Sequence, residues 1–419
     1  MSPNAIKVTL EVGSAPYQKT LAPSLAAAGM LRRVLNLGLC LEIQEPGCDG
    51  ALEVIKRYPF VQLVNRILWG IWRRLPHSLR GQPPVVVSAW LNDWLVSKWI
   101  EPSTIFHGYT GLCLASLRVA KRQGAIALVE QGSRHPRDWR QSAIEECRRF
   151  GVDPAEAGDV FPEALIRRIE REYEICDHIV VPSTFAYESF VQWGYGKKAL
   201  IVPTGVDTQF FFPPKAQERP SVFRACYVGR IELTKGMGYL LQAWKRLALP
   251  NAELLLVGEV KPDVSSLLQS CADSNIRTVG FSSLSEVARY YRQASLFVFP
   301  SVNEGLAQVL LEAMASGLAV VATDRSGACD CVTHRKEGFI IPAQDVEAIA
   351  DALLWCYQHP EEVGEMGNAA RARVQSQFTL EHYNRRIMAL YRSLVPPKTG
   401  SSPNLEINGG PIQKANSRT

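Results

Sequence analysis

Residues 295–317 read SLFVFPSVNEGLAQVLLEAMASG. The apolar run Ser295–Phe299 has the length of one strand, Pro300 ends it, and Leu306 opens a helical pattern that continues to Ser316. This order of strand, turn and helix recurs along the chain. Such repetition predicts an α/β fold in which helices cover parallel sheets.

The first half of the chain contains short apolar runs without clean alternation, the pattern of parallel strands buried on both faces. The expected strands are Ile6–Val12, Val34–Leu37, Pro84–Ser88, Thr104–His107, Ala125–Glu130 and His178–Val181. Helices are expected over Gly111–Gln123 and Phe161–Ile175.

The second half repeats this pattern more clearly. Its expected strands are Phe223–Val228, Glu253–Val257, Ile276–Val279, Ser295–Phe299, Ala319–Ala322 and Phe339–Ile341. Its expected helices are Lys235–Leu247, Leu284–Gln293, Leu306–Ser316 and Val346–Gln358.

The pattern predicts two Rossmann-like domains that face each other across a ligand cleft. A segment with Pro203, Gly205 and Pro214 marks the junction, so residues 1–200 and 201–378 form the two domains. Residues 379–395 hold a last amphipathic helix, expected to cross back to the N-terminal domain. Residues 396–419 are rich in Pro, Gly, Ser, Asn and Lys, which indicates a disordered tail.

The composition is that of a folded globular protein, with 419 residues, 47% of them hydrophobic and 21% charged. A net charge of +5 is too small for a dedicated nucleic-acid binder. The ten cysteines are scattered, and their only close pair, Cys329 and Cys331, lacks the neighbouring ligands of a metal site. With no secretory signal and no run of about eighteen apolar residues, the expected location is the cytoplasm.

Two acidic residues flank the helix start in the opening stretch. Glu304 precedes the helix and Glu312 follows about two turns later, on the order of 10 Å away at a rise of about 1.5 Å per residue. A helix start offers unpaired N–H groups to a diphosphate or a hydroxyl, and Gly305 lets the backbone approach a ligand closely. The alternative is a helix with one carboxylate as its cap and the other in solvent.

A second set of polar residues follows the strand Phe223–Val228. Gly229 ends that strand, Arg230 emerges at its carboxyl end, and Lys235 starts the next helix. Two cations at adjoining sheet ends would neutralise a diphosphate that leaves with negative charge. An arginine and a lysine on the surface, without a special role, are the alternative.

The stretch from 227 to 345 resembles the retaining GT-B glycosyltransferases of the group that includes sucrose synthases and bacterial mannosyl- and glucosyltransferases. The resemblance rests on the matching segments Val228-Gly229-Arg230, Lys235-Gly236, Leu256-Val257-Gly258, Glu304-Gly305-Leu306, Glu312-Ala313-Met314-Ala315-Ser316-Gly317 and Gly338-Phe339-Ile340-Ile341-Pro342. His178–Ser183 with Gly205-Val206-Asp207 resembles the crossing into the second domain. The resemblance covers residues 175–395 well.

The resemblance implies a role for each of these residues. Gly229, Arg230 and Lys235 would hold the donor diphosphate, and Glu312 would bind the ribose. Glu304 would contact the transferred sugar beside the N–H groups of three residues, Gly305, Leu306 and Ala307. The implied enzyme is a retaining hexosyltransferase that needs no metal and no cofactor. Its donor would be a UDP-, GDP- or ADP-sugar, and its acceptor a glycan, a lipid-linked molecule or a small molecule. The product would belong to glycan or polysaccharide biosynthesis. Its N-terminal domain would be the acceptor side.

The N-terminal half departs from the family pattern. The Gly-rich loop after the first strand reads Gly13-Ser14-Ala15-Pro16 here, and the histidine that relatives place after the strand Ala125–Glu130 is displaced to His135. His135 is a candidate catalytic residue and His107 is the other histidine candidate. The alternative for a lone loop histidine is a structural hydrogen bond.

Residues 54–92 contain six cations and no Asp or Glu, with apolar residues at helical spacing and Trp69 and Trp72 beside them. A cationic helix of this kind can lie in lipid headgroups, which predicts a peripheral contact with anionic membrane at the inner face. The alternative is a helix whose apolar stripe packs on the sheet while its arginines are solvated.

Two other functions compete with sugar transfer. A dinucleotide-dependent oxidoreductase also has Rossmann-like halves, but it needs a Gly-rich fingerprint that Gly13 does not begin. A catalytically silent GT-B homologue, acting as a binding or partner subunit, is the second. The presence of Arg230, Lys235, Glu304 and Glu312 argues against it, and the degraded N-terminal loop argues for it.

Overall fold

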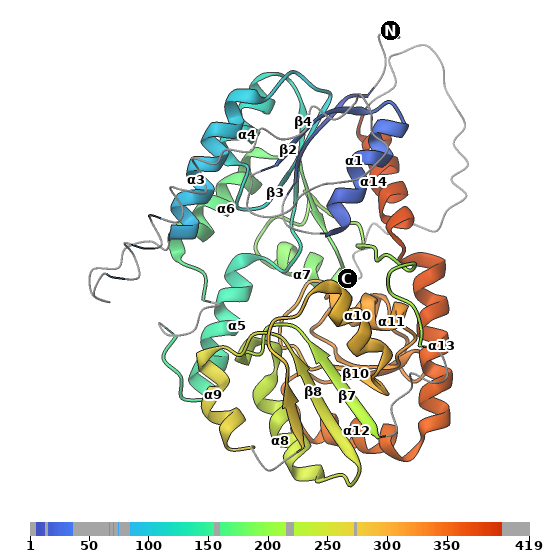
Figure 1. Cartoon of the computed structure of the whole chain (residues 1–419). Helices are drawn as coiled ribbons and strands as arrows, with labels where there is room; N and C mark the ends of the chain where they lie inside the picture. The colour runs from blue at the N-terminus through green and yellow to red at the C-terminus, as the bar shows by residue number, and fades with distance from the viewer. Residues whose placement is uncertain are drawn as a thin grey trace, which may run out of the picture.

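A computed structural model of the chain describes residues 6–12, 16–36, 67, 70, 74, 84–154, 160–214, 222–271 and 275–395. The predicted tail at 396–419, residues 13–15 of the first loop and most of residues 54–92 lie outside the described residues. The described chain forms two six-stranded sheets, one in each half, and every strand pairing in them is parallel (Figure 1). The predicted α/β class is confirmed.

The first sheet has the strand order β2-β1-β3-β4-β5-β6. Its strands are β1 Val8–Val12, β2 Leu31–Asn36, β3 Ile105–Tyr109, β4 Ile126–Glu130, β5 His178–Val181 and β6 Ala199–Ile201. The helices of this half are α1 Pro16–Ala27, α3 Pro84–Val96, α4 Leu114–Arg122, α5 Pro136–Arg149, α6 Glu163–Ile175 and α7 Thr184–Gln192, with the short 3₁₀ turn η2 Ser97–Trp99 after α3.

The second sheet has the strand order β12-β11-β10-β7-β8-β9. Its strands are β7 Phe223–Val228, β8 Ala252–Val257, β9 Ile276–Thr278, β10 Leu296–Phe299, β11 Val320–Thr323 and β12 Gly338–Ile341. Its helices are α8 Met237–Leu247, α9 Pro262–Gln269, α10 Leu284–Arg292, α11 Gln308–Ala315, α12 Val346–Gln358 and α13 Pro360–Gln377, with 3₁₀ turns η4 Leu233–Lys235 and η5 Ala328–Asp330.

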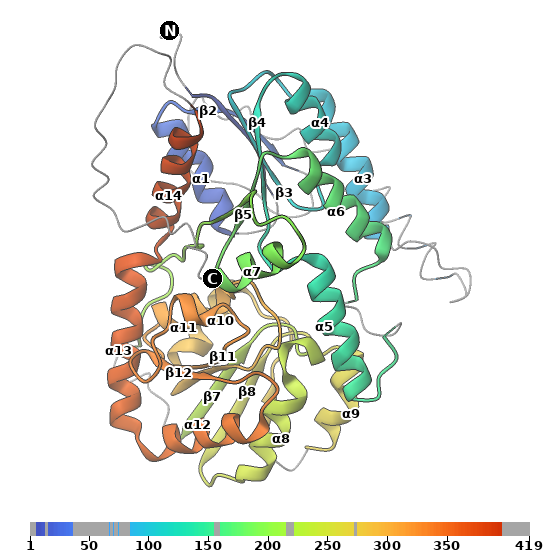
Figure 2. The ribbon, with the colours of Figure 1, turned by 180° about the vertical axis from the view of Figure 1, so that it is seen from behind.

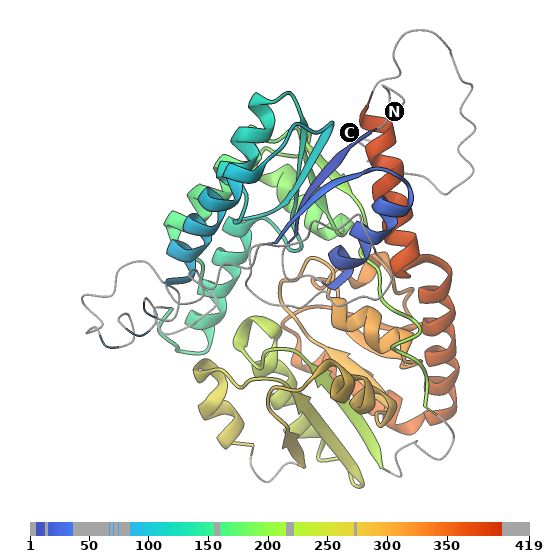
Figure 3. The same ribbon diagram turned by 45° about the horizontal axis from the view of Figure 1, so that its top comes forward.

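Two helices each extend from the half to which they belong by sequence toward the other half. Helix α14, Leu380–Leu394, follows α13 up to the first half, where it packs against α1 on one face of the first sheet, as Figures 1 and 2 show. Its Tyr383, Ile387 and Tyr391 are buried in the same cluster as Val8 and other residues of that sheet. Helix α5 reaches toward α8 and α9 of the second half. Figure 3 shows α3 and α4 on the face of the first sheet opposite α1 and α14.

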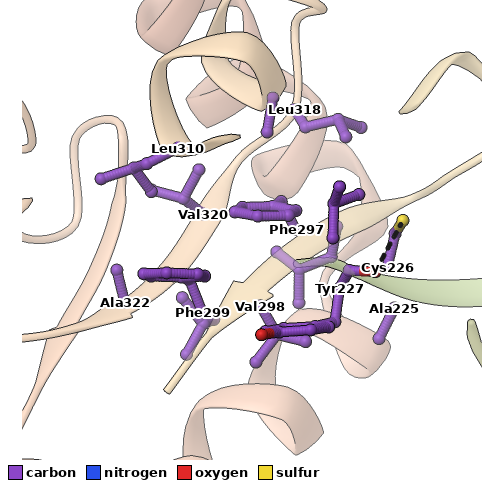
Figure 4. Packing of buried hydrophobic residues seen from close by; sticks show 14 of the residues in the cluster. Ala225, Cys226, Tyr227, Phe297, Val298, Phe299, Leu310, Leu318, Val320 and Ala322 are labelled. Carbon is purple, nitrogen blue, oxygen red and sulfur yellow. Dashed lines mark hydrogen bonds between the residues drawn. The ribbon is translucent and has the colours of Figure 1, made fainter. Parts of the chain in front are cut away.

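The core of the second half explains why its strands were the easier ones to predict. All four residues of β10 are buried, and the rings of Phe297 and Phe299 stack 6.1 Å apart, with Tyr227 of β7 stacked on Phe299 at 6.0 Å (Figure 4). Leu310 of α11 is fully buried against them in the same cluster. A strand covered on both faces carries apolar residues at every position, and the sequence shows this directly.

One predicted element is wrong in the structure, and one predicted helix begins two residues later than expected. Pro84–Ser88 is the first turn and a half of the helix α3 and not a strand. Proline fits the first position of a helix, and the helix is held by the buried Asp93, which lies beyond the apolar run and accepts hydrogen bonds from Ala115 and Ser116. The helix predicted from Leu306 begins at Gln308, since Ala307 has extended backbone angles as the N-cap. Gly305 to Ala307 therefore belong to the turn before α11.

Candidate functional site

The cationic and acidic candidates meet at the point where the strand order of the second sheet reverses. Strands β7 and β10 are neighbours, and β8 and β11 extend the sheet in opposite directions from them. Ligands of open parallel sheets bind beyond the carboxyl ends of strands at such a point. The turn after β7 carries Arg230 and Lys235, and the turn after β10 carries Glu304.

These two turns are packed directly on each other. The N–H of Val302 donates to the carbonyl of Thr234 at 3.2 Å, and the hydroxyl of Ser301 donates to the same oxygen at 3.3 Å. Gly236 has φ +74°, and a Cβ atom there would lie 2.0 Å from the carbonyl oxygen of Pro300. Glycine is required at this position, because any side chain would separate the two turns.

Lys235 and Glu304 form an ion pair across the two turns. Their side chains are only 9% and 17% exposed, so the pair is largely shielded from water. Arg230 lies farther out, half exposed, and its guanidinium is 3.0 Å from a carboxylate oxygen of Glu232. Both predicted diphosphate ligands therefore have an acidic partner when no donor is present.

The turn between Glu304 and α11 offers backbone donors beside this ion pair. In the part of the chain that the structure describes, the N–H groups of Gly305, Leu306 and Ala307 donate no hydrogen bond. They precede the N-terminus of α11, where the helix dipole favours negative charge. These N–H groups are chemically suited to an anion or a hydroxyl oxygen.

Glu312 lies on α11 and is buried. It accepts a hydrogen bond of 3.2 Å from the hydroxyl of Tyr291, and burial raises the pKa of Glu312 to about 7. Its charge can therefore change near neutral pH when a ligand donates to it.

Residues of the first half complete the surroundings of the ion pair. Trp139 of α5 places its ring over Lys235, with the ammonium nitrogen 4.6 Å from the ring centroid. Burial, followed by the charges of Glu130 and Glu304, raises the pKa of Tyr109, the last residue of β3. Neither residue was a candidate from the sequence. The sequence does contain a signal for the start of α5, however, because His135-Pro136 followed by Asp138 is typical of a helix N-terminus.

The two halves also contact each other through the turn that carries Glu304. The side-chain amide of Asn303 donates to Asp138 at 2.9 Å and to Ser142 at 2.8 Å, both on α5. The hydroxyl of Ser183, before α7, donates to the carbonyl of Gly305 at 2.6 Å. The turn is therefore positioned by both halves.

Gly305 has a different neighbour from the one that the sequence predicted. A Cβ atom at this position would lie 2.5 Å from the carbonyl oxygen of Gly132 and 2.8 Å from Cα of Ser133, both in the first half. The absence of a side chain here allows the two halves to approach each other. Close approach to a ligand remains a prediction for this residue.

A second contact between the halves is a buried carboxylate. Glu146 of α5 accepts hydrogen bonds of 3.0 and 2.9 Å from the hydroxyl of Tyr239 and one of 2.5 Å from the amide of Gln344. Burial raises the pKa of Glu146. The hydrogen bonds from Tyr239 and Gln344 cross the interface and help to hold the halves in this arrangement.

Among the contacts of the described residues, neither candidate histidine touches Lys235 or Glu304. His135 is fully buried, and its Nδ1 accepts from the N–H of Arg137 as the N-cap of α5. Its ring is surrounded by four aromatic rings, those of Tyr173, Phe190, Trp193 and Tyr195. Burial lowers the pKa of His135 to about 3, so the ring is neutral. This geometry supports the structural alternative for His135 over the catalytic one.

His107 is also buried. Its Nδ1 lies 2.6 Å from the hydroxyl of Tyr391, and its Nε2 lies 3.6 Å from a carboxylate oxygen of Glu130. Burial lowers the pKa of His107 to about 4. The residue links β3 to α14 and to the end of β4.

A substitution separates the two roles of His135. His135→Ala removes the cap and leaves a gap among the rings, and we expect the free energy of unfolding to fall by about 1–3 kcal/mol. His135→Asn keeps a capping acceptor and should lose less. Denaturant unfolding measures both values. In both variants, the rate of the predicted sugar transfer per folded molecule should be unchanged. A tenfold lower rate in a variant of unchanged stability would restore His135 as a catalytic candidate.

Comparisons with known proteins match part of the chain to a family. Residues 223–359 match the family described as Glycosyl transferases group 1. The chain is 32% identical over 168 residues to the amylovoran biosynthesis glycosyltransferase of Erwinia amylovora, covering 37% of this chain and 41% of the relative. It is 29% identical over 219 residues to alpha-maltose-1-phosphate synthase of Mycolicibacterium smegmatis, covering 46% and 56%. The chain thus spans about half the length of these curated relatives.

Two solved structures share the fold over almost the whole chain. Sucrose-phosphate synthase from Thermosynechococcus elongatus has a TM-score of 0.69 at 21% identity, covering 93% of this chain and 99% of its own. Anabaena HepE, solved in complex with UDP-glucose, has a TM-score of 0.64 at 15% identity, covering 93% and 100%. The predicted GT-B fold and the resemblance to this group are confirmed.

Proposed function

We propose that this GT-B chain, with its group 1 glycosyltransferase segment at residues 223–359, is a retaining hexosyltransferase that uses a nucleotide-diphosphate sugar. The acceptor is a glycan, a lipid-linked glycan or a small molecule, and the product belongs to glycan or polysaccharide biosynthesis. The observation that carries the proposal is the Lys235–Glu304 ion pair at the reversal of the second sheet, beside a turn whose N–H groups have no partner among the described residues.

The proposed donor binds with its diphosphate between the two turns. Arg230 and Lys235 compensate its charge, and the N–H groups at 305–307 receive oxygens of the phosphate or the sugar. Glu304, released in part from Lys235, accepts hydrogen bonds from sugar hydroxyls. Glu312 receives the ribose hydroxyls on α11. Because two protein cations neutralise the leaving group, the proposal includes no metal and no cofactor.

The proposed reaction retains the configuration of the anomeric carbon. An acceptor hydroxyl attacks that carbon from the face that the diphosphate leaves, the bond between the carbon and the phosphate oxygen breaks, and the departing phosphate takes the acceptor's proton. Lys235 and Arg230 stabilise the negative charge that grows on the diphosphate. Glu304 binds and orients the sugar and forms no bond to it.

The first test is a thermal-shift screen of the full chain against UDP-, GDP- and ADP-sugars. A ligand that binds only the folded state stabilises it by about 2.7 kcal/mol at a concentration one hundred times its Kd, so one donor class should raise the melting temperature clearly. Release of the nucleotide with an added acceptor then distinguishes an enzyme from a silent homologue, which would bind without turnover. If no donor class raised the melting temperature, the proposal would fail.

The same binding measurement has an expected pH dependence. Ribose hydroxyls that donate to Glu312 favour its ionised form, whereas burial keeps its pKa at about 7 in the free protein. Donor affinity should therefore rise by up to about tenfold from pH 6 to pH 8, because the diphosphate diester of the donor does not titrate there. Glu312→Gln removes the titrating group and should make the affinity independent of pH. An unchanged pH profile in this variant would exclude Glu312 as the ribose ligand.

The proposal also includes a peripheral location at the inner face of a membrane. Among the helices that the structure describes, none has the length and apolar run that a bilayer crossing requires. The arginine-rich residues 54–92 would instead give a reversible contact with anionic lipid.

A further inference from the structure

Exposed tryptophans gather on one outer helix of the first half. Val87, Trp90 and Trp94 of α3 are 39%, 39% and 53% exposed, and Trp99 of the following turn η2 is 40% exposed. Positions 87, 90 and 94 are spaced by three and four residues, so they share one face of the helix. Solvent exposure of several indole rings on one face is unusual, because each ring carries a large apolar area.

The other face of α3 is anchored in the protein, so the tryptophan face is fixed outward. Asp93 is fully buried and accepts hydrogen bonds from the N–H groups of Ala115 and Ser116, at 2.7 and 2.9 Å. It also pairs with Arg168 of α6. These contacts hold α3 to the start of α4, directly after β3, at the carboxyl edge of the first sheet.

The charges around this face are positive. Lys98 is exposed, and its ammonium lies 5.0 Å from the centroid of the Trp94 ring. Of the nearby acids, Asp93 is buried against Arg168, and Glu101 pairs with Arg32 and Arg33.

We infer that the exposed face of α3 and η2, formed by Val87, Trp90, Trp94, Lys98 and Trp99, docks on an anionic phospholipid surface. Indole rings suit the boundary between headgroups and acyl chains, since their apolar body is buried while the N–H stays hydrated. Each neighbouring cation adds about 1 kcal/mol of attraction to an anionic leaflet.

This inference deepens the proposed peripheral location and does not depend on the transfer reaction. It also specifies that the first half of the molecule faces the lipid. Because α3 is tied to the start of α4, shortly after β3, docking fixes the first half of the molecule to the lipid surface. The acceptor it favours is therefore a lipid-linked sugar.

The experiment is flotation of the full chain with vesicles of phosphatidylglycerol and phosphatidylcholine at low salt. The unaltered chain should float with the vesicles. The double variant Trp90→Ser, Trp94→Ser should lower the vesicle-bound fraction at least tenfold. Lys98→Gln should have a smaller effect that disappears at high salt, because salt screens the attraction. Phe281→Ser, which removes a 90% exposed aromatic from the second half, is the matched control and should float as the unaltered chain does.

Three results would overturn the inference. These are no flotation of the unaltered chain, equal flotation of the double tryptophan variant, and a change of association state in that variant, which would assign the face to a second copy. Sedimentation velocity measures the last of these. Donor thermal shifts should be the same in all variants, so a failed docking surface and a failed transfer proposal are distinguishable.

Discussion

Replacement of either Glu304 or Lys235 by alanine lowers the rate of sugar transfer by at least about tenfold while the fold is preserved. A tenfold loss corresponds to about 1.4 kcal/mol of transition-state stabilisation, the amount expected for one lost contact to the sugar or the diphosphate. The loss should appear in kcat and in kcat/KM, because the charge that Lys235 is proposed to stabilise grows only as the diphosphate leaves.

The ion pair allows stability and activity to be separated. Each single variant leaves the partner charge unpaired in a largely buried position, which we expect to lower the free energy of unfolding by about 1–3 kcal/mol. The double variant Lys235→Met with Glu304→Gln leaves no unpaired charge and should recover part of that stability. It should not recover activity.

A control pair is available on the surface. Arg246 and Glu347 also form an ion pair, but both side chains are more than half exposed. Arg246→Ala should change neither transfer nor stability by a measurable amount. Full activity in both Glu304→Ala and Lys235→Ala would contradict the proposed roles, and reduced activity in Arg246→Ala would indicate a general effect on the protein.

Gly305→Ala is expected to have a comparably large effect for a steric reason. The new Cβ atom would lie 2.5 Å from a backbone oxygen of Gly132, and backbone cannot move aside as a flexible side chain can. Either the halves separate or the turn that carries Glu304 shifts. A misplacement of about 1 Å can lower a rate by about a hundredfold, so we expect a loss of ten- to a hundredfold in transfer.

The control for this variant is Gly364→Ala. Gly364 lies within α13, and a Cβ atom there would meet nothing within 4 Å. Alanine should stabilise the helix by about 0.4–1 kcal/mol without changing transfer. Small-angle scattering measures whether Gly305→Ala opens the two halves. A variant at 305 with unchanged activity and unchanged dimensions would show that the contact with Gly132 is not needed.

Much of the fold could be predicted because its signals are local. The second sheet follows from runs such as Leu296–Phe299, in which every residue is buried and therefore apolar. The donor-side candidates follow from the same logic, because a polar residue directly after a buried strand, such as Arg230 or Glu304, must lie at the carboxyl edge of the sheet. Strand order then brought these two turns together.

The residues of the first half that surround the ion pair could not be predicted in the same way. Trp139 and Tyr109 lie in the first half, and their distance to Lys235 and Glu304 depends on how the two halves pack. The surroundings of His135 could not be predicted from the sequence either. Its position in the chain suggested chemistry, but four aromatic rings from α6, α7 and the segment directly after α7 surround it instead.

Local patterns thus specified the strands, most helices and the residues that end the strands, since periodicity, proline and glycine act over a few residues. Tertiary packing decided the rest. It made Pro84–Ser88 a helix through the buried Asp93, gave Gly305 its contact with Gly132, and placed Trp139 over Lys235. Two of these contacts join residues about a hundred or more positions apart, and contacts of that kind depend on how the halves approach each other, which no local pattern encodes.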